Sequence, residues 1–201
     1  MAERADLLTV LLAAGAARRF GGGKLDAPVA GRPLGTWSAI ALQRLPASGR
    51  LIVVPPTPPA FVDALEGWDI ATNPMPERGI GGSIAIAARH AAAYGFERMV
   101  VALADMPLVP SDHFAALADG DAIAFTRYPD GSPGVPAAFP QRRFAALAEL
   151  TSGGAAEQDW GEEIALIAPR DGQALSDVDE QGDLPAVERL FLERADRKPP
   201  Q

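Results

Sequence analysis

Near its start the amino-acid sequence has an uncharged apolar run over residues 7–13, which ends in a turn rich in glycine. A run of this kind is typical of a strand that is buried on both faces of a parallel sheet. Similar short runs recur along the chain, and the runs 121–128 and 134–139 flank a turn that predicts two adjacent strands. The predicted strands cover residues 7–13, 50–55, 98–104, 121–128, 134–139 and 163–168.

Helical signals fill the segments between these runs. Prolines and serines mark several starts, with Ser83 and Ser111 as N-caps and Asp183 as the N-cap of the last helix. This regular alternation predicts an α/β fold in which helices cover a sheet. The 201 residues suit a single domain, with its core over about residues 6–194. The predicted helices cover residues 33–45, 57–65, 84–94, 111–117, 140–150 and 185–194.

Composition narrows the classes of function. The net charge of −8 argues against a nucleic-acid partner, which would need a basic face. The absence of cysteine removes disulfides and thiolate chemistry. No run approaches the length of a membrane span, and the N-terminus lacks the apolar core of a signal peptide, so we expect a cytoplasmic protein. His90 and His113 lie on predicted helices without a metal-ligand partner, and we interpret both as structural or surface residues.

The turn after the first strand carries the clearest chemical signal. Arg18, Arg19 and Lys24 surround the triplet Gly21–Gly23, and Lys24 is one of only two lysines in the chain. Glycines allow the backbone to approach a ligand with its N–H groups free, and cations beside such amides suit a polyphosphate. Neither the P-loop spacing nor the dinucleotide pattern G-x-G-x-x-G is present. The sequence therefore predicts a phosphate-binding loop of another type, against the alternative of a flexible surface turn.

Three further segments carry candidate site residues. The loop 73–83 leads into a helix N-terminus, which is either an anion or base site or a simple cap. Asp105 directly follows the strand 98–104, where α/β sheets place their chemistry, and its carboxylate suits Mg²⁺ unless it only caps the next turn. Asp177 and Asp179 point the same way in an extended chain. Either of them can reach the same metal, or they serve the start of the last helix.

These segments together resemble the MobA-like nucleotidyltransferases. The first motif is Leu12-Ala13-Ala14-Gly15, Arg19-Phe20-Gly21 and Lys24-Leu25. The second is Asn73-Pro74, Gly79 and Ser83; Asp105-Met106-Pro107, residues 134–139 and residues 176–184 match the later ones. The resemblance implies a Rossmann-like three-layer α/β/α fold with a mostly parallel sheet and one antiparallel strand. It also implies transfer of a nucleoside monophosphate from a nucleoside triphosphate to a phosphorylated acceptor, with Mg²⁺ and release of pyrophosphate.

The resemblance also implies roles for individual residues. Arg19, Lys24 and Asp105 would be catalytic, and Asp105 and Asp179 would hold the metal. Gly134 and Pro136 would face the acceptor. The nucleotide-binding residues would be Leu12, Ala13, Ala14, Gly15, Arg19, Gly21, Lys24, Asn73, Gly79 and Ser83.

The spacing within the first motif bears on the branch of the family and on its substrates. Ala-Ala-Gly and the spacing from Arg19 to Lys24 favour the cytidylyl branch, with CTP as donor and molybdopterin as acceptor. Three positions depart from the family pattern: Ala17 replaces a serine, Asp26 an apolar residue and Gly154 an acid. The alternatives are a transferase for another phosphorylated acceptor, such as methylerythritol phosphate or a sugar phosphate, and a nucleotide- or cofactor-binding relative with little turnover. Every enzymatic interpretation requires Lys24 and Asp105 to converge.

Overall fold

A seven-stranded sheet forms the centre of the computed structural model, which describes residues 7–15, 19–161 and 163–196. The strands follow the order β5-β4-β1-β6-β8-β7-β9, and β8 alone runs against its neighbours β6 and β7. This confirms the expected mostly parallel sheet with one antiparallel strand. The strand bounds are β1 Leu7–Leu12, β4 Gly49–Val54, β5 Asp69–Thr72, β6 Arg98–Leu103, β7 Ala124–Arg127, β8 Pro133–Pro140 and β9 Ala165–Ile167.

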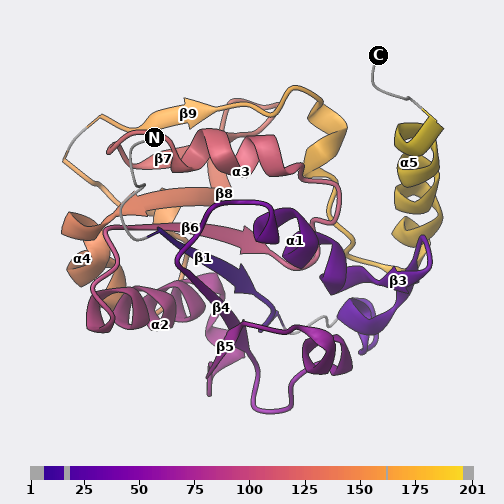
Figure 1. The fold of residues 1–201 in the computed structure, drawn as a ribbon, viewed down its shortest axis with the longest axis horizontal. Helices are drawn as coiled ribbons and strands as arrows, with labels where there is room; N and C mark the ends of the chain where they lie inside the picture. The colour runs from indigo at the N-terminus through magenta and orange to yellow at the C-terminus, as the bar shows by residue number, and fades with distance from the viewer. Residues whose placement is uncertain (1–6, 16–18, 162, 197–201) are drawn as a thin grey trace.

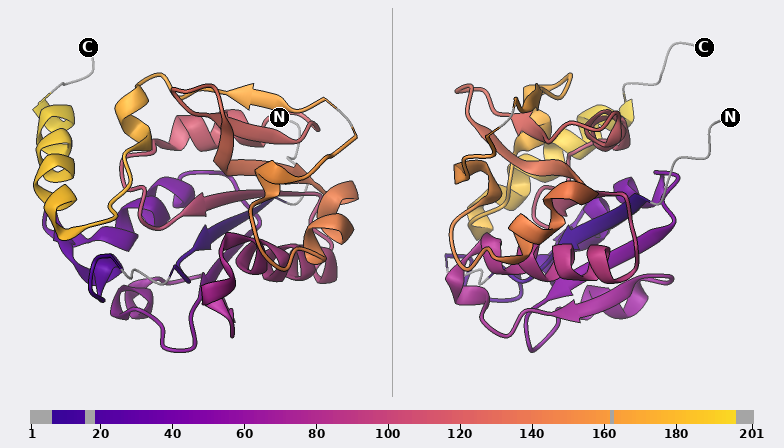
Figure 2. Two further views of the ribbon diagram at one scale, coloured as in Figure 1. Left: turned by 180° about the vertical axis from the view of Figure 1, so that it is seen from behind. Right: turned by 90° about the vertical axis from the view of Figure 1, so that its left-hand side faces the viewer.

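Helices cover both faces of this sheet, as Figures 1 and 2 show. On one face α1 (Leu34–Gln43) and α3 (Ser111–Ala118) pack on alternate strand residues such as Leu11. On the other face α2 (Ile80–Ala93) and α4 (Phe144–Ala148) pack on the residues between, such as Val10. The uncharged run of β1 is therefore buried on both sides, because each face of the sheet has its own hydrophobic core.

The last helix, α5 (Leu184–Asp196), lies at one end of the molecule beside a small ribbon of β2 (Pro28–Val29) and β3 (Arg32–Pro33). The ring of Phe191 on α5 stands 4.5 Å from that of Trp37 on α1. The backbone N–H of Ala30 in the ribbon donates to Glu188 on α5. No helix in the described ranges is both long and apolar enough to cross a bilayer.

The parallel strands bring the sequence motifs to one edge of the sheet. Strands β1, β4, β5 and β6 are mutually parallel, so their carboxyl ends coincide. The glycine loop follows β1, the loop 73–79 follows β5, and Asp105 follows β6 by two residues. The fold therefore gathers segments that are far apart in the sequence into one place, as expected for an α/β sheet.

The structure corrects several predicted elements. Residues 57–65 form only the short 3-10 helix η2 (Ala60–Ala64), because the prolines at 55, 56, 58 and 59 delay its start. Helix α2 begins at Ile80, so Ser83 lies inside it and is not its N-cap. Ser111 is the first helical residue of α3, after Pro110. The predicted helix 140–150 divides into η4 (Gln141–Arg143) and α4, and the exposed edge strand β5 is an element that the sequence pattern does not predict.

Candidate active site

The glycine loop turns sharply in front of the sheet. Gly21, Gly22 and Gly23 all have positive φ (87°, 102° and 64°), a region that L side chains rarely adopt. Phe20 is buried and anchors the loop in the core, whereas the Arg19 side chain is 71% exposed. Lys24 begins the 3-10 helix η1 (Lys24–Asp26), and its side chain is only 9% exposed. The loop thus places one exposed guanidinium and one buried ammonium at the end of β1.

Asp26 has a structural role that the sequence did not explain. Its carboxylate accepts hydrogen bonds from the backbone N–H groups of Ala60 (3.0 Å) and Phe61 (2.7 Å). These are the first residues of η2, and they have no intrahelical acceptor of their own. The acid at position 26 therefore holds the glycine loop against the segment that follows β4.

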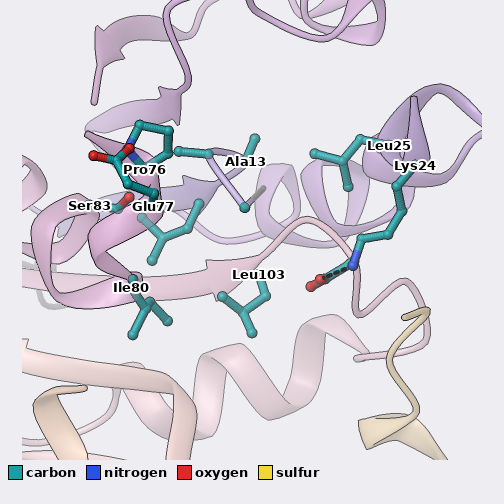
Figure 3. A pocket seen from close by; sticks show the side chains of 13 residues that line it. Ala13, Lys24, Leu25, Pro76, Glu77, Ile80, Ser83 and Leu103 are labelled. Carbon is teal, nitrogen blue, oxygen red and sulfur yellow. Dashed lines mark hydrogen bonds and ion pairs between the residues drawn. The ribbon is translucent and has the colours of Figure 1, made fainter. Parts of the chain in front are cut away.

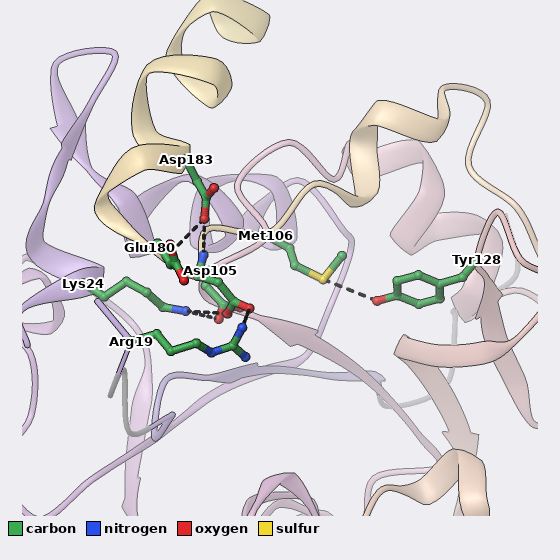
Figure 4. A network of polar contacts seen from close by, with 8 residues as sticks. Arg19, Lys24, Asp105, Met106, Tyr128, Glu180 and Asp183 are labelled. Carbon is green, nitrogen blue, oxygen red and sulfur yellow. Dashed lines mark hydrogen bonds and ion pairs between the residues drawn. The ribbon is translucent and has the colours of Figure 1, made fainter. Parts of the chain in front are cut away.

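An ionic cluster joins the loop to two distant segments of the chain (Figure 4). The Lys24 ammonium lies 2.6 Å from a carboxylate oxygen of Asp105 and 3.9 Å from Asp179. The guanidinium of Arg19 lies 2.8 Å from Asp179. The two cations that the sequence assigns to the triphosphate therefore neutralise the two carboxylates that it assigns to the metal.

The segment 176–184 is held against the end of β6 by a backbone hydrogen bond. The N–H of Val178 donates to the carbonyl of Asp105 (3.1 Å), and the Val178 side chain is fully buried. Asp177 and Asp179 flank this anchor. The pKa of Asp177 is raised, first by burial and then by the negative charge of Asp179, with a smaller contribution from Asp105. Three carboxylates thus gather around one buried lysine.

Asp183, the predicted N-cap of the last helix, binds backbone N–H groups of the turn that precedes α5. Its carboxylate accepts from the backbone N–H groups of Asp179 and Glu180, both at 2.8 Å. It forms a capping box with Glu180 around the 3-10 helix η7 (Gln181–Asp183). The side chain of Gln181 donates to the carbonyl of Phe20 (3.2 Å), which ties this turn to the glycine loop.

The second predicted motif forms the wall opposite the ionic cluster. The buried Asn73 accepts from the N–H of Met75 (3.0 Å) and donates from its amide nitrogen to the Ser83 hydroxyl (2.9 Å). Its own N–H bonds to Val54 (2.7 Å). Asn73 therefore fixes the short 3-10 helix η3 (Pro76–Arg78) between strand β4 and helix α2, and Gly79 reverses the chain with φ 94°.

A cavity of about 420 Å³ lies between these walls (Figure 3). It brings together most of the predicted nucleotide-binding residues; Arg19, Gly21 and Asn73 are not among the residues that line it. A second cavity of about 360 Å³ adjoins it behind Gly22 and Gly23. The residues lining the first cavity are Leu12, Ala13, Ala14, Gly15, Lys24, Leu25, Pro76, Glu77, Gly79, Ile80, Ser83, Leu103 and Asp105.

The predicted acceptor residues lie apart from this cavity. Gly134 and Pro136 are both on β8, and the peptide bond between Val135 and Pro136 is cis. A Cβ at Gly134 would stand 2.6 Å from the ring of Tyr128, so packing inside the protein accounts for this glycine. The Tyr128 hydroxyl donates to the carbonyl of Val135 (2.6 Å) and contacts the Met106 sulfur at 3.8 Å. Sequence reasoning gave Tyr128 no role, because its hydroxyl partners come from two segments that no local pattern links to it, the loop after β6 and strand β8.

Burial dominates the electrostatics of Tyr128. It raises the pKa of the Tyr128 phenol to about 12, with further contributions from the negative charges of Asp177 and Asp105. The phenol therefore stays neutral at physiological pH. Its hydroxyl then donates to Val135 within the β7–β8 hairpin, and its contact with the Met106 sulfur joins this hairpin to the loop after β6.

The donor set fits a hard divalent cation. Mg²⁺ in nucleotide sites is held by one or two carboxylates together with phosphate oxygens. Asp105 and Asp179 supply such a pair, since both lie within 4 Å of the same Lys24 ammonium. In the described ranges no three acidic or histidine side chains form a complete metal cage. The arrangement therefore suits a metal that arrives with a triphosphate and not a metal enclosed by protein alone.

Two departures from the family pattern can be compared with the structure, and Ala17 lies outside the described residues. Asp26 has the structural role given above. The carbonyl of Gly153 accepts from the N–H of Gly81 (2.8 Å), so the loop that contains Gly154 abuts the first turn of α2. A Cβ at Gly154 would lie 3.8 Å from a carboxylate oxygen of Glu157. An acidic group therefore stands next to position 154 although the residue there is glycine.

Both histidines have partners inside the fold and lie away from the cavity. His113 is buried and contacts the Thr126 hydroxyl at 2.9 Å. His90 lies 3.6 Å from Asp69 and stacks near Tyr94. Burial lowers the pKa of both rings, which favours the neutral form. Neither position is suited to a hydrolytic triad at the carboxyl edge of the sheet.

The chain resembles several solved structures over nearly its whole length, at low identity. Rv0371c from Mycobacterium tuberculosis H37Rv is 22% identical, with a TM-score of 0.76 over 92% of this chain and 98% of that one. A nucleotidyl transferase from Methanothermobacter thermautotrophicus is 17% identical, with a TM-score of 0.81 over 94% and 99%. Molybdopterin-guanine dinucleotide biosynthesis protein A from Archaeoglobus fulgidus is 16% identical, with a TM-score of 0.70 over 92% and 99%.

These likenesses establish the fold, and the family follows from the sequence itself. No curated protein sequence matches the chain. The family model for the MobA-like NTP transferase domain matches residues 9–166, which include the glycine loop, the second motif, Asp105 and the β7–β8 hairpin. The protein belongs to the MobA-like NTP transferase family and is a nucleotidyltransferase.

Proposed function

We propose that this nucleotidyltransferase transfers CMP from CTP to a phosphorylated acceptor, with molybdopterin as the first choice, and releases pyrophosphate. The observation that carries the proposal is the ionic cluster at the mouth of the cavity. There the buried Lys24 meets Asp105 at 2.6 Å and Arg19 meets Asp179 at 2.8 Å. Cations for a triphosphate and carboxylates for its metal therefore stand at one point, beside a cavity of suitable size for a nucleoside.

Each group has a role that its position allows. The amides of the glycine loop, Arg19 and Lys24 would bind the triphosphate and neutralise its charge. Asp105 and Asp179 would hold Mg²⁺, which when bound withdraws negative charge from the phosphate oxygens. Binding of the nucleotide would separate Lys24 from Asp105, since the ammonium and the carboxylate then have new partners.

The reaction needs little covalent participation by the protein. An oxygen of the acceptor phosphate forms a bond to the α-phosphorus, and the bond from the α-phosphorus to the oxygen bridging the β-phosphorus breaks. The electron pair leaves with pyrophosphate. A phosphate nucleophile is already ionised at neutral pH, so no general base is required. Positioning and charge stabilisation by Arg19 and Lys24 would supply most of the acceleration.

Different observations support the assignment of the nucleotide and that of the acceptor. The Ala13-Ala14-Gly15 sequence and the five-residue spacing from Arg19 to Lys24 support CTP. For the acceptor, one structural neighbour is a molybdopterin-guanine dinucleotide biosynthesis protein. Another is a 4-diphosphocytidyl-2C-methyl-D-erythritol synthase, 16% identical with a TM-score of 0.70, which keeps methylerythritol phosphate as the second candidate.

The test is pyrophosphate release from CTP, GTP, ATP and UTP with Mg²⁺, with molybdopterin or methylerythritol phosphate as acceptor. We expect release with CTP and molybdopterin, and loss of about 100-fold or more in kcat for Lys24→Ala. Arg189→Ala, which removes an exposed cation on α5, is the matched control and should leave the rate unchanged. Release with methylerythritol phosphate alone would move the acceptor assignment to the second candidate. Full turnover by Lys24→Ala would refute the role of that lysine.

A further inference from the structure

The cavity has two chemically different ends (Figure 3). Lys24 and Asp105 form one end, where the proposed triphosphate begins. The middle is apolar, with Ala13 and Leu103 facing the space. Glu77 and Ser83 both line the opposite end. A nucleotide whose phosphates contact Lys24 would therefore direct its base towards Glu77 and Ser83.

Glu77 is carried by a rigid support. It is the central residue of η3, whose turn is closed by hydrogen bonds from Arg78 to Met75 and from Gly79 to Pro76, both 3.2 Å. The buried amide of Asn73 fixes the start of this turn. Within the described residues the Glu77 carboxylate makes no hydrogen bond or ion pair. The backbone thus holds this exposed carboxylate, unpaired among the described residues, at the wall of the cavity.

The neighbouring Ser83 offers the complementary group. The N–H of Met75 donates to the amide oxygen of Asn73, so the amide nitrogen of Asn73 faces Ser83 and donates to its hydroxyl. The Ser83 oxygen is therefore an acceptor in this contact, and its own proton remains for another partner. The lining of the far end of the cavity therefore includes one hydroxyl donor and one carboxylate, which can only accept.

We propose that Glu77 selects nucleotides whose base carries an exocyclic amino group, an inference that rests on the proposed nucleotide site. The carboxylate would accept a hydrogen bond from the amino group, N4 in cytosine, while the Ser83 hydroxyl donates to the adjacent ring nitrogen. In uracil a carbonyl oxygen replaces the amino group. That oxygen would face the Glu77 carboxylate without a proton between them, which costs binding because both are acceptors.

The test compares two nucleotides that differ at this one group. Binding of CTP and UTP is measured by titration calorimetry with Mg²⁺ and without acceptor. We expect CTP to bind about ten-fold or more tightly than UTP, the size of one charge-assisted hydrogen bond. Glu77→Gln should bring the CTP:UTP ratio close to one, since an amide can both donate and accept. Glu97→Gln, which removes another exposed acid at the opposite edge of the sheet, should keep the ratio of the native protein.

Each outcome separates this inference from the proposed function. Equal binding of CTP and UTP by the native protein, or an unchanged ratio in Glu77→Gln, would overturn the role of Glu77 and leave the nucleotide site in place. A Glu77→Gln protein that has lost its folded circular dichroism spectrum is replaced by Glu77→Ala, which must also lower the ratio. Absence of binding by both nucleotides would overturn the nucleotide site and this inference together.

Discussion

The Lys24 ammonium and the Asp105 carboxylate lie 2.6 Å apart although 81 positions separate them in the chain. The lysine side chain is 9% exposed and the aspartate side chain 26%. Arg19 and Asp179 form a second pair at 2.8 Å beside them. Without ligand, each of these two carboxylates therefore has a cationic partner. The proposed nucleotide and metal would have to separate these pairs together, because either one alone leaves a partner without a counter-charge.

Lys24→Met should destabilise the protein, and Mg²⁺ should reverse part of the loss. The substitution removes the one buried cation among Asp105, Asp177 and Asp179, and these carboxylates then repel one another. We expect a loss of about 1–2 kcal/mol, which is roughly 2–8 °C in melting temperature for a domain of this size. Millimolar Mg²⁺ should raise the melting temperature of Lys24→Met more than that of the native protein. Thermal melts at matched ionic strength measure this, and equal shifts would contradict the charge balance described here.

Asp105→Asn should strengthen nucleotide binding without metal and weaken it with metal. The amide still accepts a hydrogen bond but no longer neutralises Lys24, which becomes available to a triphosphate. Without divalent metal, in the presence of a chelator, CTP should bind this variant about ten-fold more tightly than the native protein. With Mg²⁺ the order should invert, since the substitution removes a proposed metal ligand. Asp121→Asn, an exposed acid at the other edge of the sheet, is the matched control.

The sequence predicts the part of this site that rests on local pattern. The glycine triplet marks a special turn, and Asp105 follows an apolar run, so sequence pattern alone places both at the carboxyl edge of the sheet. The three-layer fold and the reversed strand β8 follow from the family resemblance and are confirmed. The assigned roles of Arg19, Lys24, Asp105 and Asp179 remain predictions for experiment.

Other features depend on contacts that no local pattern encodes. Asp26 stands in the sequence as an unexplained acid, and only the folded chain shows that it binds the N–H groups of Ala60 and Phe61. The helix predicted over 57–65 is reduced to η2. Its apolar spacing favours a helix, but four prolines just before η2 restrict the backbone and outweigh that preference. The role of Tyr128 likewise depends on long-range packing, because its hydroxyl contacts β8 and the loop after β6.

Gly134→Ala should destabilise the protein through Tyr128. The new methyl group would stand 2.6 Å from the tyrosine ring, and overpacking of this kind costs about 1–3 kcal/mol. In a Tyr128→Leu background the same substitution should cost much less, so the two changes are non-additive in chemical denaturation. Gly172→Ala, where a Cβ meets nothing within 4 Å, is the matched control.

The same pair of variants tests the predicted acceptor role of Gly134. If the glycine serves only to accommodate Tyr128, the KM for the acceptor should recover in the double variant together with stability. If it instead lets the acceptor approach, Gly134→Ala should raise that KM in both backgrounds. Steady-state kinetics with varied acceptor at saturating CTP distinguish the two explanations.

The buried ring of His113 should make the protein less stable below neutral pH. The Thr126 hydroxyl donates its single proton to the carbonyl of Pro136 (2.6 Å), so it must accept from the Nε2–H of His113 at 2.9 Å. Burial lowers the pKa of this ring below 6.5, and the charge of Asp112 opposes the shift only in part. As the pH falls below 6.5, the unfolded chain therefore binds a proton at His113 more readily than the folded chain does. The stability that His113 provides is complete above pH 6.5 and is lost as the pH falls below that value.

Denaturant midpoints at about pH 7.5 and about pH 5.5, on either side of the ordinary histidine pKa, measure the effect. His113→Gln should reduce the difference between the two midpoints, because glutamine does not titrate and its amide can still donate to Thr126. His90→Gln should reduce it less, since the His90 side chain is 15% exposed and Asp69 stabilises its charged form. An unchanged pH dependence in His113→Gln would show that this ring titrates alike in the folded and unfolded chains, which is incompatible with the buried neutral donor at Thr126.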